Sequence, residues 1–408
     1  MKERAILAIS HSNYIINSAG TEKCIRDIEN LLNKEGIYYI QIFPVRFKNC
    51  IGVYFKKKFR GIYSYSDIIG LLQKYKIDLI GIHIHHLLYH NLHNIINLLK
   101  ELNLPITYFV HDYYAICSNY NLINSSGNYC GMSFPNKKKC ANCSYYATSI
   151  YKHKEFENFF KTLANLIYKI ITPSQFVATA WQNVYPIHTN KILIRNHLVP
   201  SRQNCIITNK KNTKLRIAYC GAKANAKGFM EWEKLILENK EKFEFFYLGT
   251  DKNKEKNVTN IYVNNVLQGS NAMTNALIQN HIDVVFLWST WPETYCYVYY
   301  EASMANCIII TNTISGNVAN EVEKVGNGFI FDSLQDLQDN INNKSFHNAV
   351  LDIYKNNILI PKQYSANESL DGLLFETNKD KIKYPKRFCT KKVLLSYCYA
   401  IKHKLRLY

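Results

Sequence analysis

The sequence contains no long hydrophobic run. No window approaches the roughly 20 consecutive apolar residues that a membrane-spanning helix needs, although hydrophobic residues make up 47% of the 408 positions. The apolar segment Arg4–Ser10 is too short, and too soon interrupted by His11 and Asn13, to predict a signal peptide. We therefore expect a globular, cytoplasmic protein in which the 12 cysteines are reduced thiols.

Acidic residues are also scarce. The chain has 31 Asp and Glu against 50 Lys and Arg, a formal net charge of +19. A basic surface suits phosphates, whether in a nucleotide, a nucleic acid or anionic lipid headgroups. Biased codon usage, which also enriches Lys, Asn, Ile, Tyr and Phe, explains part of the excess without selection for binding.

Segments typical of buried strands and of helices alternate along most of the chain. This alternation predicts an α/β protein with two doubly wound domains of parallel strands covered by helices. A polar stretch without periodicity, 200–214, is expected to link a first domain (1–199) to a second (215–376), followed by a basic amphipathic tail (377–408). Strands are expected at Arg4–Ser10, Ile37–Phe43, Ile77–Ile84, Ile106–Val110, Lys169–Ser174, Lys191–Arg195, Leu215–Gly221, Phe243–Gly249, Ile261–Val266, Val284–Ser289, Cys307–Thr311 and Gly328–Phe331.

Two turns at strand ends could bring a phosphate close to a helix. Gly20 precedes an expected helix and would let a phosphate approach the free amides at its N-terminus. In the second domain Gly221 ends a strand, and Lys223 and Lys227 bracket the turn, where they could neutralise a diphosphate. The segment is neither a GxGxxG fingerprint nor a Walker loop. In the alternative interpretation Gly20 simply ends a loop and both lysines are solvated.

Two carboxylates stand in otherwise apolar and aromatic sequence. In WPETYCYVYYEASMANC (Trp291–Cys307), seven residues separate Glu293 from Glu301, and Glu301 falls inside a helix that is expected to be buried. A lone buried carboxylate costs on the order of several kcal/mol unless something pairs with it. A helix-start acid plus an internal salt bridge is one solution. A ligand with adjacent hydroxyl groups is another.

A polar pair, His111-Asp112, ends the expected strand Ile106–Val110. It lies at the carboxyl edge, where open α/β sheets place their ligands. His83 and His85 alternate on another strand and share one face. Strand-edge histidines of this kind are more often hydrogen-bonded packing residues than metal ligands.

The cysteines cluster in one loop-like segment, residues 117–143. Cys117, Cys130, Cys140 and Cys143 lie within these 27 residues, and the last two have the spacing of a zinc knuckle. A structural zinc ion, a disulfide and plain thiols are all compatible with this pattern.

Together these motifs resemble the retaining glycosyltransferases of family four, which have the two-domain GT-B fold. PETYCYVYYEA is similar to that family's E-x7-E signature, and SAGTE, IDLIGIHIHH and TPSQFV have counterparts in it. HDYYAICSNYNLINSSGNYC, with the later cysteines, is similar to a subgroup that builds bacterial surface polysaccharides. The resemblance covers Arg4 to about Glu376, and it implies two Rossmann-like domains that face a central cleft.

The resemblance also implies roles for the two carboxylates. Glu293 would hold the transferred hexose of a nucleotide-sugar, and Glu301 would hold its ribose. Eight helical residues rise roughly 12 Å, which is comparable with the distance between these two sugars. The helix N-terminus near Thr294, Tyr295 and Cys296 would aim its amides at the diphosphate.

Further residues match the donor side of the family's site. His111 would lie near the donor sugar from the acceptor domain, and Lys227 matches the diphosphate lysine. Ala222 stands where the family usually has Arg, so Lys223 is the candidate substitute. The catalytic residues implied are therefore His111 and Glu293, and the donor-binding residues are Gly20, Gly221, Lys223, Lys227, Thr294, Tyr295, Cys296 and Glu301.

The implied enzyme is a hexosyltransferase acting with retention. It would move a sugar from a nucleotide-sugar to a polyprenyl-diphosphate-linked oligosaccharide, in the biosynthesis of a bacterial O-antigen or capsule. No catalytic metal is expected, and no Asp-x-Asp motif asks for one. Two rivals stay open: a nucleotide-sugar-binding protein without catalysis, and a basic nucleic-acid-binding protein. The second lacks a recognisable module, so we expect no nucleic-acid partner.

The basic tail follows a helix expected at Ser365–Glu376. From Lys379 to Tyr408 ten Lys and Arg face one acid, and the apolar run Val393–Ile401 has near-helical spacing. A basic flank beside an apolar face suits an anionic membrane surface, so we expect a peripheral protein at the inner face of the plasma membrane. The alternatives are a solvated terminal helix and a tail packed back across the first domain, as the GT-B fold often allows.

Overall fold

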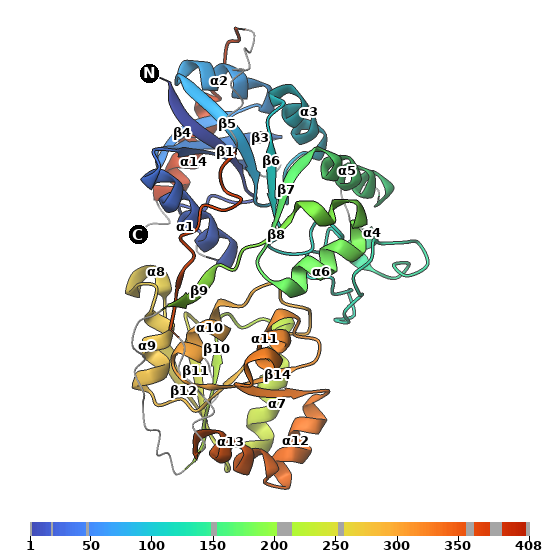
Figure 1. The fold of residues 1–408 in the computed structure, drawn as a ribbon, viewed down its shortest axis with the longest axis vertical. Coiled ribbons are helices and arrows are strands. Elements are labelled where there is room, and N and C mark those ends of the chain that lie inside the picture. The colour runs from blue at the N-terminus through green and yellow to red at the C-terminus, as the bar shows by residue number, and fades with distance from the viewer. Residues whose placement is uncertain are drawn as a thin grey trace.

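The computed structural model describes most of the chain as two α/β domains stacked along one long axis (Figure 1). Residues 202–213 of the predicted linker and residues 377–385 and 405–408 of the predicted tail lie outside the described residues. The described residues are 2–17, 19–45, 49–147, 153–201, 214–251, 257–355, 363–375 and 386–404.

The first domain is built on an eight-stranded sheet. Its strands are β1 (Glu3–Ile9), β2 (Tyr38–Val45), β3 (Cys50–Phe55), β4 (Lys58–Tyr63), β5 (Ile77–Ile84), β6 (Ile106–Phe109), β7 (Ile167–Thr172) and β8 (Ile192–Ile194). They lie in the order β4-β3-β2-β1-β5-β6-β7-β8, parallel except for the antiparallel pairs β2-β3 and β3-β4. Apolar runs in the sequence predict six of these strands but not the hairpin of β3 and β4.

Helices cover both faces of this sheet, as the apolar runs of its strands require. Residues of α2, α3, α5 and α6 share one core with the sheet, and residues of α1 share the other. The helices are α1 (Gly20–Lys34), α2 (Ile68–Lys74), α3 (Leu92–Leu102), α4 (Ser144–Ala147), α5 (His153–Leu166) and α6 (Gln175–Val184), with 3₁₀ turns at Tyr65–Asp67 and Pro186–Lys191.

The second domain has a six-stranded parallel sheet. Its strands are β10 (Arg216–Cys220), β11 (Glu244–Gly249), β12 (Val258–Tyr262), β13 (Val284–Phe286), β14 (Ile308–Asn312) and β15 (Gly328–Phe331), in the order β12-β11-β10-β13-β14-β15. The helices are α7 (Phe229–Asn239), α8 (Asn265–Gln268), α9 (Ala272–Gln279), α10 (Tyr297–Met304), α11 (Asn317–Val325), α12 (Leu334–Asn342) and α13 (Ser345–Lys355), with a 3₁₀ turn at Asn225–Lys227. Separate cores on the two faces make this domain doubly wound as well.

The chain crosses between the domains twice. β9 (Leu198–Ser201) and β16 (Gln363–Ala366) pair antiparallel at this crossing. The helix expected at Ser365–Glu376 is therefore wrong: its described part is the end of a strand followed by turns. The Arg195 guanidinium donates hydrogen bonds to two backbone carbonyls of this segment, those of Asn367 and Ser369, at 2.9 and 2.8 Å. Tertiary contacts thus replace the helical hydrogen bonds.

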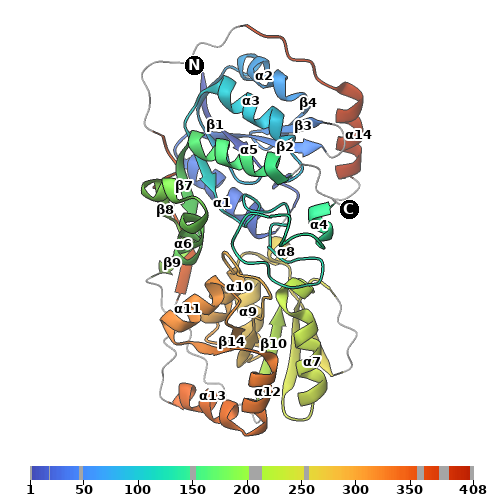
Figure 2. The same cartoon turned by 90° about the vertical axis from the view of Figure 1, so that its right-hand side faces the viewer.

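After this crossing the chain rejoins the first domain. Leu373 and Phe375 are buried in the core on the α1 face. Gly81 in β5 provides the space for Phe375, because a Cβ atom there would lie 2.1 Å from its ring. The final helix, α14 (Val393–Lys404), lies beside β4 (Figure 2).

Both sheets have a switch point that faces the other domain. The strand order reverses direction between β1 and β5 in the first domain and between β10 and β13 in the second. Ligands of open α/β sheets bind outside the carboxyl ends of strands at such points. The fold therefore places the loops after β1, β5, β6 and β13 around one shared space.

Candidate functional site

A cavity of about 410 Å³ lies between the two domains. Its walls come from the loops that follow β1, β5, β6, β8 and β13 and from the first turns of α1 and α10. The residues that line it include His11, Gly20, Glu22, His86, His111, Asp112 and His197 from the first domain and Trp291, Glu293, Thr294, Tyr295 and Tyr297 from the second. The volume is in the range of small-molecule sites.

Glu293 lies in the loop between β13 and α10, where it is 4% exposed. Its Oε1 accepts a hydrogen bond from Ser289 Oγ at 2.6 Å and forms an ion pair with Lys227 Nζ at 2.8 Å. The two predicted site residues are thus in direct contact. Burial lowers the pKa of Lys227 and the Glu293 carboxylate raises it, and the net pKa lies above its usual range, so the ammonium stays charged.

The backbone of Glu293 is fixed by the start of α11. Its carbonyl accepts from Asn317 N at 2.9 Å, and it forms a parallel bridge with Gly316. Gly316 has φ +62°, and a Cβ atom there would lie 2.6 Å from the backbone of Pro292. Only glycine permits this close approach.

Glu301 lies inside α10 and is 4% exposed. Its Oε1 accepts from Asn265 Nδ2 at 3.2 Å, and its carbonyl accepts from Thr274 Oγ1. Burial raises the pKa of Glu301 to about 7, and Asn265 and Lys23 counteract this only in part. The internal salt bridge considered from the sequence exists at Glu293 and not at Glu301, whose buried carboxylate has one long side-chain hydrogen bond among the described residues.

His111 follows β6, and its ring stacks on Phe109 and His85. Its Nε2 lies 3.2 Å from His85 Nδ1. Burial lowers the pKa of His111 to about 3, so the imidazole is neutral at physiological pH. His83 and His85 hydrogen-bond to Tyr39, which agrees with a packing role.

Thr294 and Tyr295 join the two domains beside the cavity. Thr294 Oγ1 donates to the carbonyl of His111 at 2.6 Å, and its own carbonyl accepts from Ser174 Oγ at 3.0 Å. The Tyr295 hydroxyl accepts from Leu198 N at 3.0 Å. Any movement of the domains relative to each other must therefore break hydrogen bonds at the predicted donor site.

Of the predicted residues, five are not among those that line the cavity: Gly221, Lys223, Lys227, Cys296 and Glu301. Gly221 directly follows β10 and has φ +100°. The Lys223 ammonium lies 4.7 Å from the centre of the Tyr247 ring. Cys296 is buried at the start of α10, and burial raises the pKa of its thiol to about 11.

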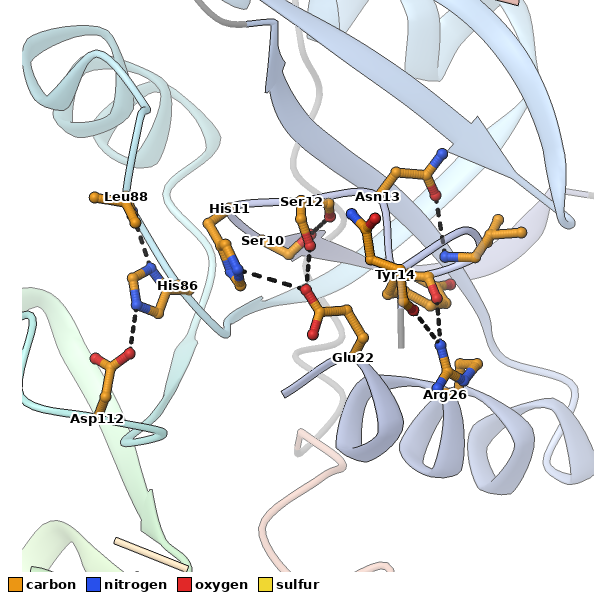
Figure 3. Close-up of polar contacts among 12 residues, drawn as sticks. Ser10, His11, Ser12, Asn13, Tyr14, Glu22, Arg26, His86, Leu88 and Asp112 are labelled. Carbon is orange, nitrogen blue, oxygen red and sulfur yellow. Dashed lines mark hydrogen bonds and ion pairs between the residues drawn. The ribbon is translucent and has the colours of Figure 1, made fainter. Parts of the chain in front are cut away.

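Several polar residues of the first-domain wall were not predicted from the sequence. Glu22 in α1 is 2% exposed, and its Oε1 accepts from Ser12 Oγ and lies 3.4 Å from His11 Nε2 (Figure 3). Its Oε2 is buried with no hydrogen-bond partner among the described residues. The SAGTE segment contained this signal, because a glutamate in the first turn of α1 must face the same edge as Gly20.

Across the cavity from Glu22, Asp112 of the predicted polar pair contacts a residue that was not predicted, His86. His86 Nε2 donates to Asp112 Oδ2 at 2.7 Å, as Figure 3 shows. Burial raises the pKa of Asp112. His86 and the hydrogen bond from a backbone amide lower it by more, so the pKa of Asp112 lies below its usual range. The cavity therefore has an anionic group on the first-domain side.

Among the described residues, one group has ligand atoms close enough together to hold a metal, and it is not the four-cysteine segment. Cys117, Cys130, Cys140 and Cys143 all line a second, smaller cavity of about 30 Å³, and their thiols are free. Among the described residues, the set whose ligand atoms lie within 4.8 Å of one another is Cys24, His111 and His197. In this set Cys24 Sγ lies 3.5 Å from His197 Nδ1. The zinc ion considered for the four-cysteine segment stays a prediction.

Comparisons with known proteins show the fold. No protein-family model and no curated protein matches the chain. Sucrose-phosphate synthase from Thermosynechococcus elongatus has a similar structure, with a TM-score of 0.56 and 11% identity over 85% of this chain and 91% of that one. WaaG, a glycosyltransferase involved in lipopolysaccharide biosynthesis, gives 0.50 and 13% over 86% and 94%. Anabaena Alr3699/HepE in complex with UDP gives 0.50 and 14% over 88% and 94%.

The chain has the GT-B fold. The predicted fold class, two Rossmann-like domains facing a central cleft, is confirmed. Among the described residues, no helix has both the length and the apolar character to cross a membrane.

Proposed function

We propose that this protein is a glycosyltransferase that takes a sugar from a nucleotide-sugar and transfers it with retention. The observation that carries the proposal is the pair of carboxylates at α10. Glu301 is buried with a raised pKa and one long side-chain hydrogen bond, while Glu293, eight residues before it, meets Lys227 beside a cavity that both domains line.

A nucleotide-sugar matches this arrangement group by group. Glu301 would accept hydrogen bonds from the two ribose hydroxyls, which offsets the cost of burying its charge. Glu293 would hold hydroxyls of the transferred hexose, and the N-terminus of α10 lies between them, where amides favour a diphosphate. The bound UDP of Anabaena HepE, a protein of the same fold, supports a nucleoside diphosphate as the ligand class.

Transfer would begin with cleavage of the bond between the sugar and the diphosphate. The departing diphosphate gains charge in the transition state, and pre-placed cations stabilise it most. Lys227 is charged and is held against Glu293, which lines the cavity, so we assign it this role, with Lys223 as a candidate second cation. His111, neutral and at the first-domain wall, would contact the donor sugar. We expect no catalytic metal.

We further propose a polyprenyl-diphosphate-linked oligosaccharide as the acceptor, in the assembly of a bacterial surface polysaccharide, at the inner face of the plasma membrane. WaaG, of the same fold, is involved in lipopolysaccharide biosynthesis, which supports this acceptor class.

The test is product formation. Parent protein is incubated with each of a panel of labelled nucleotide-sugars and membrane extracts that contain lipid-linked oligosaccharides. We expect one donor to label the lipid fraction, and the anomeric configuration of the product to equal that of the donor. A protein that binds a donor but labels no acceptor and hydrolyses no donor would be a binding protein instead.

A further inference from the structure

The C-terminal segment 386–404 is held firmly against the first domain. Lys392 N donates to the carbonyl of Ile62 at 2.9 Å, and Ile62 N donates to Ser396 Oγ at 2.9 Å. These bonds occupy backbone groups of the edge strand β4, which would otherwise be open to pairing with another chain. The Tyr399 ring contacts Phe43 and Phe59. One face of α14 is therefore a packed interface.

The opposite face of α14 is apolar and uncovered. Val393, Leu394 and Tyr397 are 56%, 77% and 67% exposed, and Phe388, just before the helix, is fully exposed. Residues 393, 394 and 397 share a helical face, whereas the buried Ser396 and the packed Tyr399 point the other way. Contiguous apolar side chains of this size on a surface mark a site of interaction.

The charge around this face has one sign. The segment 386–404 contains six Lys and Arg and no Asp or Glu. Lys386 and Lys391 are exposed. Lys386 lies two residues before Phe388, whereas the stem of Lys391 lies against Gly61 of β4, where a Cβ atom would be 2.5 Å from Lys391 Cε. Arg387 forms an ion pair with Glu101 and so belongs to the packed side.

We propose that the outer face of α14, together with the basic segment before it, binds an anionic lipid bilayer. Apolar and aromatic side chains would enter the boundary between headgroups and acyl chains, and the lysines would bind anionic headgroups. A helix pinned by its inner face needs no ordering on binding, so its outer side chains are already arranged for the membrane.

The outer face of α14 belongs to a helix that is connected to the wall of the large cavity. The Tyr399 hydroxyl accepts from Asn13 Nδ2 at 3.3 Å, and Asn13 lies two residues beyond His11, which lines the large cavity. The membrane-binding edge and the first-domain wall of the cavity are thus joined through one short loop. Membrane binding at this edge would present a membrane-anchored acceptor to the cleft, and this role rests on the proposed function. Lipid binding by α14 does not depend on the proposed function.

The test is sedimentation with vesicles of about 30% phosphatidylglycerol in phosphatidylcholine, without donor or acceptor, so its outcome is separate from transfer activity. We expect the parent to bind and the triple variant Phe388→Ser, Leu394→Ser, Tyr397→Ser to lose most binding. The matched control changes three exposed apolar residues of the second domain, Met230→Ser, Leu237→Ser and Leu267→Ser, which are 50%, 69% and 74% exposed. The control should bind like the parent.

Charge provides a second arm. Lys386→Gln and Lys391→Gln should each weaken binding about fivefold at low salt, and less at high salt. Equal binding by the parent and the triple variant, both with the parent's melting temperature, would overturn the proposal. So would a parent that binds no vesicles. A parent dimer that the triple variant converts to monomer, without vesicle binding, would make the face a contact between two copies of the chain.

Discussion

At the scale of single residues, the site depends on buried charge. Glu293 and Glu301 have the same chemistry and the same exposure, but one is paired with Lys227 and the other is not. The sequence allowed both acids to be singled out, because carboxylates in an apolar run are costly. It could not distinguish them, because Lys227 reaches Glu293 from 66 positions away.

We predict that the pH dependence of donor affinity reports Glu301. Its pKa is raised to about 7 in the folded protein, so donor affinity should fall as pH drops below about 7, as the carboxyl gains a proton. Glu301→Gln should remove this dependence and bind the donor weakly at every pH, by about tenfold or more at pH 8. Calorimetry between pH 5.5 and 8.5 measures this.

The raised pKa of Glu301 should also affect the stability of the protein without any ligand. A carboxyl group whose pKa is raised in the folded protein lowers the free energy of unfolding as pH rises from its pKa in the unfolded chain, about 4.5, to its pKa in the folded protein. This loss of stability persists above pH 7. Glu301→Gln should therefore raise the free energy of unfolding at pH 8 by up to about 3 kcal/mol. Glu323→Gln, on an exposed position of α11, is the control. An unchanged unfolding curve for Glu301→Gln would contradict the assignment of its pKa.

Glu293→Gln is expected to reduce transfer more than donor affinity. The change removes a charge-assisted contact to the hexose and frees Lys227, so the loss should be about tenfold or more in kcat. Steady-state kinetics with the cognate donor separate the two effects. A variant with parent kcat would remove Glu293 from the reaction.

His111→Ala is expected to abolish most transfer while donor affinity stays within a few-fold. The residue belongs to the opposite domain from the one that would hold the nucleotide. Because its pKa is lowered to about 3, it should add no inflection to the pH profile of transfer between pH 5 and 8. Full activity of the variant would place it outside the site.

At the scale of secondary-structure elements, apolar runs were the dependable signal. Twelve predicted strands all have a counterpart, because parallel strands covered on both faces need such runs. Ile261–Val266 was misplaced, since β12 ends at Tyr262 and α8 begins at Asn265. The segment after β16 resembled a helix in its composition, but Arg195 and the packing of Phe375 determine its path. Such long-range contacts leave no local pattern.

The cysteine-rich segment between β6 and α5 is the element whose stability most needs an explanation. It has a small apolar cluster and little regular structure over many residues. A structural zinc ion would stabilise it. We predict about one zinc per chain by metal analysis, lost in Cys140→Ser with Cys143→Ser and kept in Cys50→Ser with Cys389→Ser. Zinc that survives the first pair of changes would instead lie at Cys24, His111 and His197. Folded, active protein without zinc would exclude both.

At the scale of the whole molecule, the described residues nearest both ends of the sequence, in β1 and α14, pack in the first domain. The tail alternative of a free, solvated helix does not hold for the described residues, since α14 packs on β4. Deletion of 386–408 should therefore lower the melting temperature and promote aggregation, because it exposes the edge of β4 and the rings of Phe43 and Phe59. Calorimetric melting and light scattering measure this. A truncated protein as stable and as soluble as the parent would contradict this role.

The fold and the carboxylate pair together make one central claim, that this cleft binds a nucleotide-sugar. Isothermal calorimetry of the parent protein against a panel of nucleotide-sugars, with duplex DNA as the alternative ligand, tests it most directly. The account predicts that one nucleotide-sugar binds with a stoichiometry of one per chain, at pH 8, and that DNA does not compete with it. Binding of DNA with no response to any member of the panel would contradict it.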